Sequence, residues 1–160
     1  MKRNLLRFGL LSLLLVFACI AKAQDVTAIW DFQKNLPEGI NTATNFQGTT
    51  GDVNSTVEGI TMHVDATTGK LKGRTSDAQF NTGTKLQIPV KSAKDVVTVT
   101  SYPNYHNYTI GGVAATADVT DHKATSAEVA QGYVEVIAIG SSYLYQVKVV
   151  HVSAIQEKAL

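Results

Sequence analysis

The sequence predicts an all-β protein: an antiparallel two-sheet β-sandwich of the jelly-roll or galactose-binding-like kind. Two observations predict it. After residue 24, short runs rich in β-branched residues recur at close intervals, and clusters of Gly, Asn, Asp and Thr separate them, while helical periodicity is nearly absent. Each antiparallel strand buries one face, so about seven to nine such strands pack best as two sheets face to face.

The first 23 residues have the composition of a secretory signal. Basic residues open the segment, an apolar run follows at residues 8–20, and Ala-Lys-Ala at 21–23 supplies the small residues of a cleavage site. This run is shorter than the roughly 20 apolar residues that a membrane-spanning helix needs. A retained membrane anchor and acylation of Cys19 stay open as alternatives.

Charge and cysteine content narrow the function classes. Four of the 14 basic residues lie in the leader, which leaves 10 against 13 acidic residues and a net charge of −3. No Lys/Arg cluster can displace counterions from phosphates, so we expect no nucleic-acid partner. The single cysteine lies in the leader, which excludes disulfides and thiolate metal sites from the rest. We expect cleavage after residue 23, one β-sandwich module at 24–153, and a tail or the start of a linker at 154–160.

Strands are expected wherever apolar residues alternate with polar ones. Ile60, Met62 and Val64 share one face, for example, and Trp30 is expected to anchor the core. Pro89 cannot donate to a ladder, so its strand lies at a sheet edge or ends there. The expected strands are 28–32, 59–65, 85–90, 96–102, 108–110, 133–139 and 144–152, with weaker candidates near Leu71 and Phe80. Residues 126–131 form at most one helical turn and are expected to be a loop.

Residues 101–112, SYPNYHNYTIGG, hold three of the six tyrosines of the chain. Tyr102 shares the face of the polar residues before it and is expected to point to solvent. Pro103 and Asn104 predict a turn. Beyond that turn Tyr105 has outward parity, whereas Tyr108 shares the face of the apolar residue two positions on and is expected to pack in the core.

Exposed tyrosines beside Asn and His suit a carbohydrate ligand. A sugar ring offers an apolar C–H face to an aromatic ring and hydroxyls to amides and imidazoles. Two basic side chains on a nearby loop would receive a carboxylate, arginine through a bidentate fork. The alternatives are tyrosines that cap strand ends with buried rings and basic residues that are merely solvated. The candidate ligand-binding residues are Tyr102, Tyr105, His106, Asn107, Lys72 and Arg74.

Motifs of catalysis and of metal binding are missing from the sequence. The four histidines are scattered without metal-ligand spacing, and we expect no metal and no cofactor. Asp118 and Asp121 lie close together, which leaves a calcium loop open as an alternative to a polar turn. No carboxylate pair, G-x-S-x-G elbow or phosphate-binding glycine loop stands out, so the chain is not expected to be an enzyme by itself.

Five short strings point to a known type of module: IWDF at 29–32, AQFNTGT at 78–84 running into IPV at 88–90, YTIGG at 108–112, QGYVEV at 131–136 and SYLY at 142–145. Together they resemble the accessory β-sandwich domain that precedes the catalytic β-helix in secreted bacterial pectinesterases and pectate lyases.

The resemblance implies a secreted, periplasmic or cell-surface bacterial protein that binds or positions an acidic, pectin-like polysaccharide. It also implies a neighbouring catalytic domain as partner. The shortness of the apolar run at 8–20 predicts no membrane span once the signal is removed. The alternative is a structural spacer that docks against an enzyme domain and binds no glycan.

Overall fold

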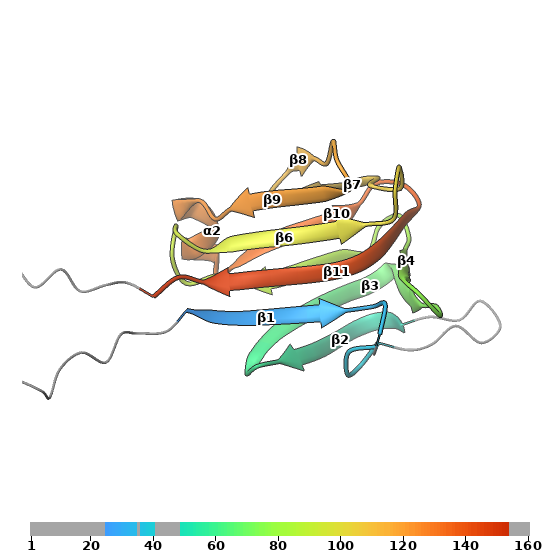
Figure 1. Ribbon diagram of the computed structural model, residues 1–160, viewed down its shortest axis with the longest axis horizontal. Coiled ribbons are helices and arrows are strands. Elements are labelled where there is room, and N and C mark those ends of the chain that lie inside the picture. The colour runs from blue at the N-terminus through green and yellow to red at the C-terminus, as the bar shows by residue number, and fades with distance from the viewer. Residues whose placement is uncertain (1–24, 35, 41–48, 154–160) are drawn as a thin grey trace, which may run out of the picture. The chain divides into compact units, whose positions relative to one another are not determined.

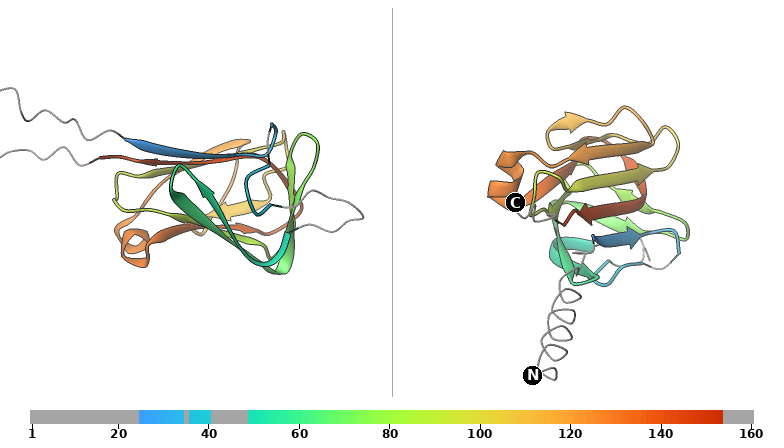
Figure 2. Two further views of the ribbon diagram at one scale, coloured as in Figure 1. Left: turned by 90° about the horizontal axis from the view of Figure 1, so that it is seen from below. Right: turned by 60° about the vertical axis from the view of Figure 1, so that its left-hand side comes forward.

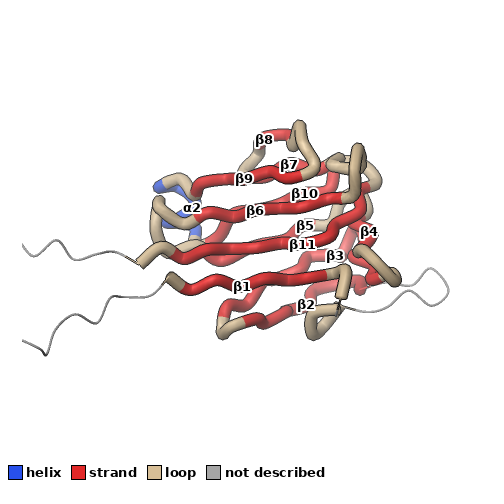
Figure 3. The backbone as a smooth tube through the Cα atoms, in the orientation of Figure 1, coloured by secondary structure: helices blue, strands red, loops and turns tan. Residues whose placement is uncertain are grey.

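Antiparallel strands make up most of the described chain, which comprises residues 25–34, 36–40 and 49–153 of the computed structural model (Figures 1 and 3). The predicted leader, Cys19 and the tail at 154–160 lie outside these residues. The strands are β1 (Val26–Asp31), β2 (Thr49–Val57), β3 (Ile60–Gly73), β4 (Ala78–Phe80), β5 (Lys85–Pro89), β6 (Val96–Ser101), β7 (Tyr108–Ile110), β8 (Val113–Ala114), β9 (Val119–Lys123), β10 (Tyr133–Ala138) and β11 (Ser142–His151).

The last eight strands form a jelly roll. One sheet has the order β4-β11-β6-β9 and the other has the order β5-β10-β7-β8. The two layers are visible from the side in Figure 2. β3 pairs with β5 near its start and with β4 at its end, and so carries the chain from one layer to the other. The predicted fold class, an antiparallel two-sheet sandwich, is confirmed.

β1 and β2 extend the two sheets at one side. β1 pairs with β11, and β2 pairs with β3 through a hairpin closed by Glu58 and Gly59, which both have positive φ as a two-residue type I′ turn requires. Trp30 lies between the layers, fully buried, and its indole N–H donates to the carbonyl oxygen of Ser55 at 3.2 Å. The prediction that Trp30 anchors the core is therefore confirmed.

The strand pattern of the sequence missed three elements: the two-residue strand β8 and the longer strands β2 and β9. β2 contains Gly51, Asp52 and Asn54, which disfavour strands, but its backbone pairs with β3 along nearly its whole length. β9 lies where the sequence left a polar turn or a calcium loop open, but it pairs with β6 as an outer strand with no fully buried residue. In both of these longer strands sheet pairing overrides local propensity.

One further expectation needs correction, and the alternative left open at Pro89 is decided. Residues 126–131, expected as a loop, form the helix α2 (Ser126–Gln131), because Thr125 and Glu128 make a reciprocal capping box and Gly132 ends the helix in a left-handed conformation. The strand with Pro89 is not at an edge, since β5 lies between β3 and β10. It ends at Pro89, the second of the two alternatives.

Candidate functional site

A tight turn places two of the predicted tyrosines side by side. The N–H of Tyr105 donates to the carbonyl oxygen of Tyr102 at 2.9 Å, and Asn104 has φ of 64°. Proline at the second position and a left-handed asparagine at the third are the pattern of a type II turn. The predicted turn is confirmed, and it brings the ring centroids of Tyr102 and Tyr105 to 5.8 Å.

Asp118, just before β9, holds this turn in place. Its Oδ1 accepts the backbone N–H of Asn104 at 2.8 Å and lies 3.0 Å from Nδ1 of His106. Its carbonyl oxygen also accepts the N–H of Ser101 at 2.7 Å. The carboxylate therefore serves the turn and the imidazole, which explains its position without a metal ion. Among the described residues no group of three or more His, Cys, Asp or Glu side chains is arranged to hold a metal.

Two tyrosines from the first half of β11 complete an aromatic cluster, which we define as Tyr102, Tyr105, Tyr143 and Tyr145. The N–H of Tyr102 donates to the carbonyl oxygen of Tyr143 at 2.7 Å, which sets the two strands in register. Ring centroids are 4.8 Å apart for Tyr105 and Tyr143, and 5.7 Å apart for Tyr102 and Tyr145. All contacts are edge-to-face, the geometry that aromatic pairs prefer.

Exposure separates this cluster from the core. Tyr102 and Tyr105 keep 45% and 43% of their surface exposed, whereas Tyr108, three residues on, is fully buried with its hydroxyl 3.4 Å from the carbonyl oxygen of Val99. The predicted outward and inward orientations are thus confirmed. Burial raises the pKa of the Tyr108 phenol, and burial together with Tyr102 raises that of Tyr145, so both stay neutral near pH 7.

An ion pair from the β3–β4 hairpin flanks the cluster. The N–H of Arg74 donates to the carbonyl oxygen of Asp77 at 2.7 Å and closes the hairpin. Nε of Arg74 lies 3.1 Å from Oδ1 of Asp77, and the guanidinium carbon lies over the ring of Tyr143 at 4.7 Å. Burial raises the pKa of the Asp77 carboxyl, and the positive charge of Arg74 opposes this shift only in part.

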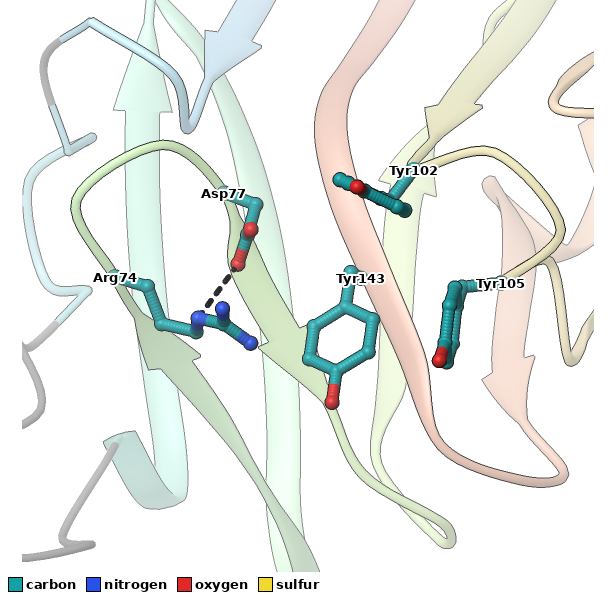
Figure 4. Close-up of a pocket in the computed structure, with 5 residues that line it drawn as sticks. All are labelled: Arg74, Asp77, Tyr102, Tyr105 and Tyr143. Atoms are coloured by element: carbon teal, nitrogen blue, oxygen red, sulfur yellow. Dashed lines mark ion pairs between the residues drawn. The ribbon is translucent and has the colours of Figure 1, made fainter.

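These residues line an open depression of about 260 Å³. Figure 4 shows Tyr143 between Arg74 on one side and Tyr105 on the other, with Tyr102 and Asp77 beside them. The lining residues come from three separate segments, namely the β3–β4 hairpin, the turn after β6 and the start of β11. The depression offers aromatic surface, phenolic hydroxyls and guanidinium N–H groups, which can stack on an apolar face and hydrogen-bond to hydroxyls.

The structure brings only some of the predicted site residues together. Tyr102, Tyr105 and Arg74 line the depression, and His106 lies behind the turn against Asp118. The amide of Asn107 donates to the carbonyl oxygen of Ser141 at 2.8 Å, so this side chain ties two loops. Lys72 does not line the depression.

Lys72 nevertheless lies on the same face of the sheet. It pairs with Gln79 of β4, which pairs in turn with Tyr143 of β11. Alternation along both strands puts these residues on the face opposite the buried neighbours Leu71 and Phe80.

Sequence reasoning missed Tyr143 and Asp77. A signal for Tyr143 was present, since Ser142 and Leu144 have the opposite parity and are both buried. No sequence signal marked Asp77, because its pairing with Arg74 depends on the hairpin geometry.

Comparisons with protein-family models and with curated proteins find no match. Among solved structures, a chain described by the words "The complexity of the Ruminococcus flavefaciens cellulosome reflects an expansion in glycan recognition" superposes with a TM-score of 0.48 at 14% sequence identity. The match covers 81% of this chain and 97% of that chain. A likeness of this size carries no argument about function. In the part of the chain that the structure describes, no helix has the length and apolar character to span a membrane.

Proposed function

We propose that the protein is a carbohydrate-binding module and that the aromatic depression contacts the sugar. The observation that carries the proposal is the convergence of Tyr102, Tyr105, Tyr143 and Arg74 from three segments onto one open surface. Aromatic rings that stay exposed on the outside of a sandwich do not stabilise the fold by burial, so packing alone does not explain why they gather there.

The geometry suits sugar rings better than a deeply buried small molecule. The depression is open, and two of its rings remain almost half exposed. A ligand there keeps much of its surface in water, so affinity is modest, with a Kd of about 10 μM to 1 mM. Guanidinium N–H groups and phenol hydroxyls at the rim are matched to the hydroxyls of a sugar.

More specific expectations remain part of the proposal. A pectin-like polysaccharide as ligand and a neighbouring pectinesterase or pectate lyase domain as partner rest on the resemblance of the short sequence segments. Export from the cell rests on the signal-like composition of residues 1–23, and the lack of catalysis by the module itself rests on the missing catalytic motifs. The alternative is a structural spacer, in which the tyrosines pack against an adjoining domain.

The test is titration calorimetry with neutral and acidic plant cell-wall oligosaccharides, on the wild type and on Tyr143→Ala. Tyr133→Ala is the matched control, since Tyr133 is a partly exposed tyrosine on β10 outside the cluster. We expect Tyr143→Ala to weaken binding by about 1 to 3 kcal/mol, the scale of base stacking on aromatic residues, and Tyr133→Ala to leave it unchanged. Absence of heat with every glycan at millimolar concentration would overturn the proposal and favour the spacer.

A further inference from the structure

Among the described residues, Arg74 is the one cation that lines the depression, and it is already paired. Arg74 contacts Asp77 through Nε at 3.1 Å, and both residues line the same surface. The side chain of Arg74 is 45% exposed, but that of Asp77 is only 4% exposed. The carboxylate therefore has little access to water, and Arg74 supplies most of its charge compensation.

Because the Asp77 carboxylate is buried, its stability as an ion depends on the contact with Arg74. Oδ1 of Asp77 has no aligned hydrogen-bond donor among the described residues, so the contact with Arg74 is its principal partner. The side chain of Ser76 also hydrogen-bonds the carboxylate, but Arg74 contributes more to stabilising its charge. A buried charge that loses its main partner is strongly destabilising. A ligand carboxylate therefore cannot draw the guanidinium away without leaving Asp77 buried and without its main compensating charge. The stacking of Arg74 on Tyr143 at 4.7 Å also holds the guanidinium in place.

The surrounding charges do not restore a positive field. Behind the turn, Asp118 contacts His106 at 3.0 Å, which adds a second carboxylate near the tyrosines. Lys72 shares the face but does not line the depression. The charges of Arg74 and Asp77 cancel, and Asp118 leaves the surroundings of the rings without net positive charge.

We propose that this site selects uncharged sugar residues, and that within pectin it prefers methyl-esterified over free galacturonate. The inference rests on the proposed function and deepens it by naming the ligand class. The guanidinium keeps its Nη hydrogens for hydroxyl and ester carbonyl oxygens, while a free carboxylate meets the negative charge of Asp77, which lines the same depression. It differs from the acidic ligand that the sequence predicts, in which Arg74 would receive a carboxylate through a bidentate fork.

The first test compares two ligands that differ in whether their carboxyl groups are ionised or methyl-esterified. An oligogalacturonide trimer and its fully methyl-esterified counterpart are titrated into the wild-type protein at low and high salt. We expect the ester to bind with a salt-independent Kd and the free acid to bind at least about tenfold more weakly at low salt. Binding of the free acid as tight as that of the ester sinks the inference and leaves carbohydrate binding standing. Absence of binding by these two ligands and by all neutral glycans removes both proposals.

The second test removes the negative charge that neutralises Arg74. Asp77→Asn keeps the shape of the side chain and removes its charge, so Arg74 gains net charge. We expect the free acid to gain about tenfold in affinity with a new salt dependence, while the ester changes little. An unaltered preference in a folded Asp77→Asn protein contradicts the inference, and the wild-type comparison decides the matter if this variant does not fold.

Discussion

The two ends of strands β6 and β11 are built in opposite ways. At one end Asp95, fully buried, lies 2.7 Å from Nδ1 of His151, and its carboxylate accepts the N–H groups of Lys91, Ser92 and Val152 at 2.7, 3.2 and 3.1 Å. At the other end lies the aromatic cluster, whose rings touch one another and open to solvent. Figure 1 shows β6 and β11 in the front layer, with α2 near the end where β6 begins and β11 ends.

The contrast shows which groups are available for a ligand. The oxygens of Asp95 have four donors from the protein, so the carboxylate ties the loop before β6 to the end of β11. The tyrosine rings contact one another edge-to-face, and Tyr102 and Tyr105 keep almost half of their surface exposed. We conclude that one end of the sandwich contributes stability and the other contributes surface.

The largest expected effect tests whether the exposure of a tyrosine, and not its residue type, determines whether it stabilises the fold or offers surface to a ligand. Tyr108 lies beside the aromatic cluster in sequence but is fully buried. We expect Tyr108→Ala to lower the free energy of unfolding by about 3 to 5 kcal/mol through lost burial and a cavity. Urea unfolding followed by circular dichroism measures it. A loss below about 1 kcal/mol would show that the ring is not part of the core.

Asp95→Asn tests the buried end. The variant keeps the size of the side chain but removes the negative charge that four donors share, and it sets an amide group against N–H donors. We expect a loss of about 2 to 3 kcal/mol in urea unfolding, the scale of hydrogen bonds to a charged group. Asp52→Asn is the control, because Asp52 is exposed and lies 3.5 Å from His63 on the surface of the β2–β3 hairpin. Equal losses in the two variants would contradict the division between the ends.

The sequence predicted which faces of the strands are buried better than it predicted the full set of strands. Alternation identified the buried faces and the outward tyrosines, because side-chain parity is fixed within a strand. It did not identify β2 and β9, whose polar residues become strands only through pairing with β3 and β6. The helix α2 was within reach, since Thr125 and Glu128 have the spacing of a capping box.

The candidate site shows the same limit. The turn at Pro103 and Asn104 follows from local chemistry and was predictable. The meeting of that turn with Tyr143 and with the Arg74–Asp77 pair depends on three segments far apart in sequence. A single sequence gives no distance between such segments. It therefore could not predict that Asp77 neutralises the charge of Arg74 in the depression.

Protonation of Asp95 at low pH should also lower the stability of the fold, by less than the Asp95→Asn substitution. Burial raises the pKa of Asp95, but the N–H of Lys91, the imidazole of His151 and the N–H of Val152 outweigh it and hold the pKa below its usual value of 3.8. A lowered folded-state pKa stabilises the protein above the unfolded-state pKa, and this stabilisation is lost as pH falls through the folded value. We expect the melting temperature to fall below about pH 4, and to fall less steeply in Asp95→Asn. Parallel curves for the two proteins would show that other carboxyl groups cause the loss.

The smallest expected effect on stability belongs to Tyr105→Ala. The ring makes edge-to-face contacts with Tyr102 and Tyr143 at 5.8 and 4.8 Å, but 43% of the residue is exposed. Such contacts contribute about 0.5 to 1.5 kcal/mol each beyond burial, and the remaining rings can close part of the gap.

We therefore expect urea unfolding of Tyr105→Ala to show a loss of about 1 kcal/mol, well below that of Tyr108→Ala. Calorimetry should show glycan affinity weakened by about 1 to 3 kcal/mol in the same variant. Tyr105→Phe separates the two roles of the side chain, because it keeps the ring and removes the hydroxyl. If stacking dominates, Tyr105→Phe retains most of the affinity; if the hydroxyl dominates, it loses as much as Tyr105→Ala. A variant that loses several kcal/mol of stability and no affinity would place Tyr105 in the structural scaffold, and the distinction between a stabilising end and a binding end would fail.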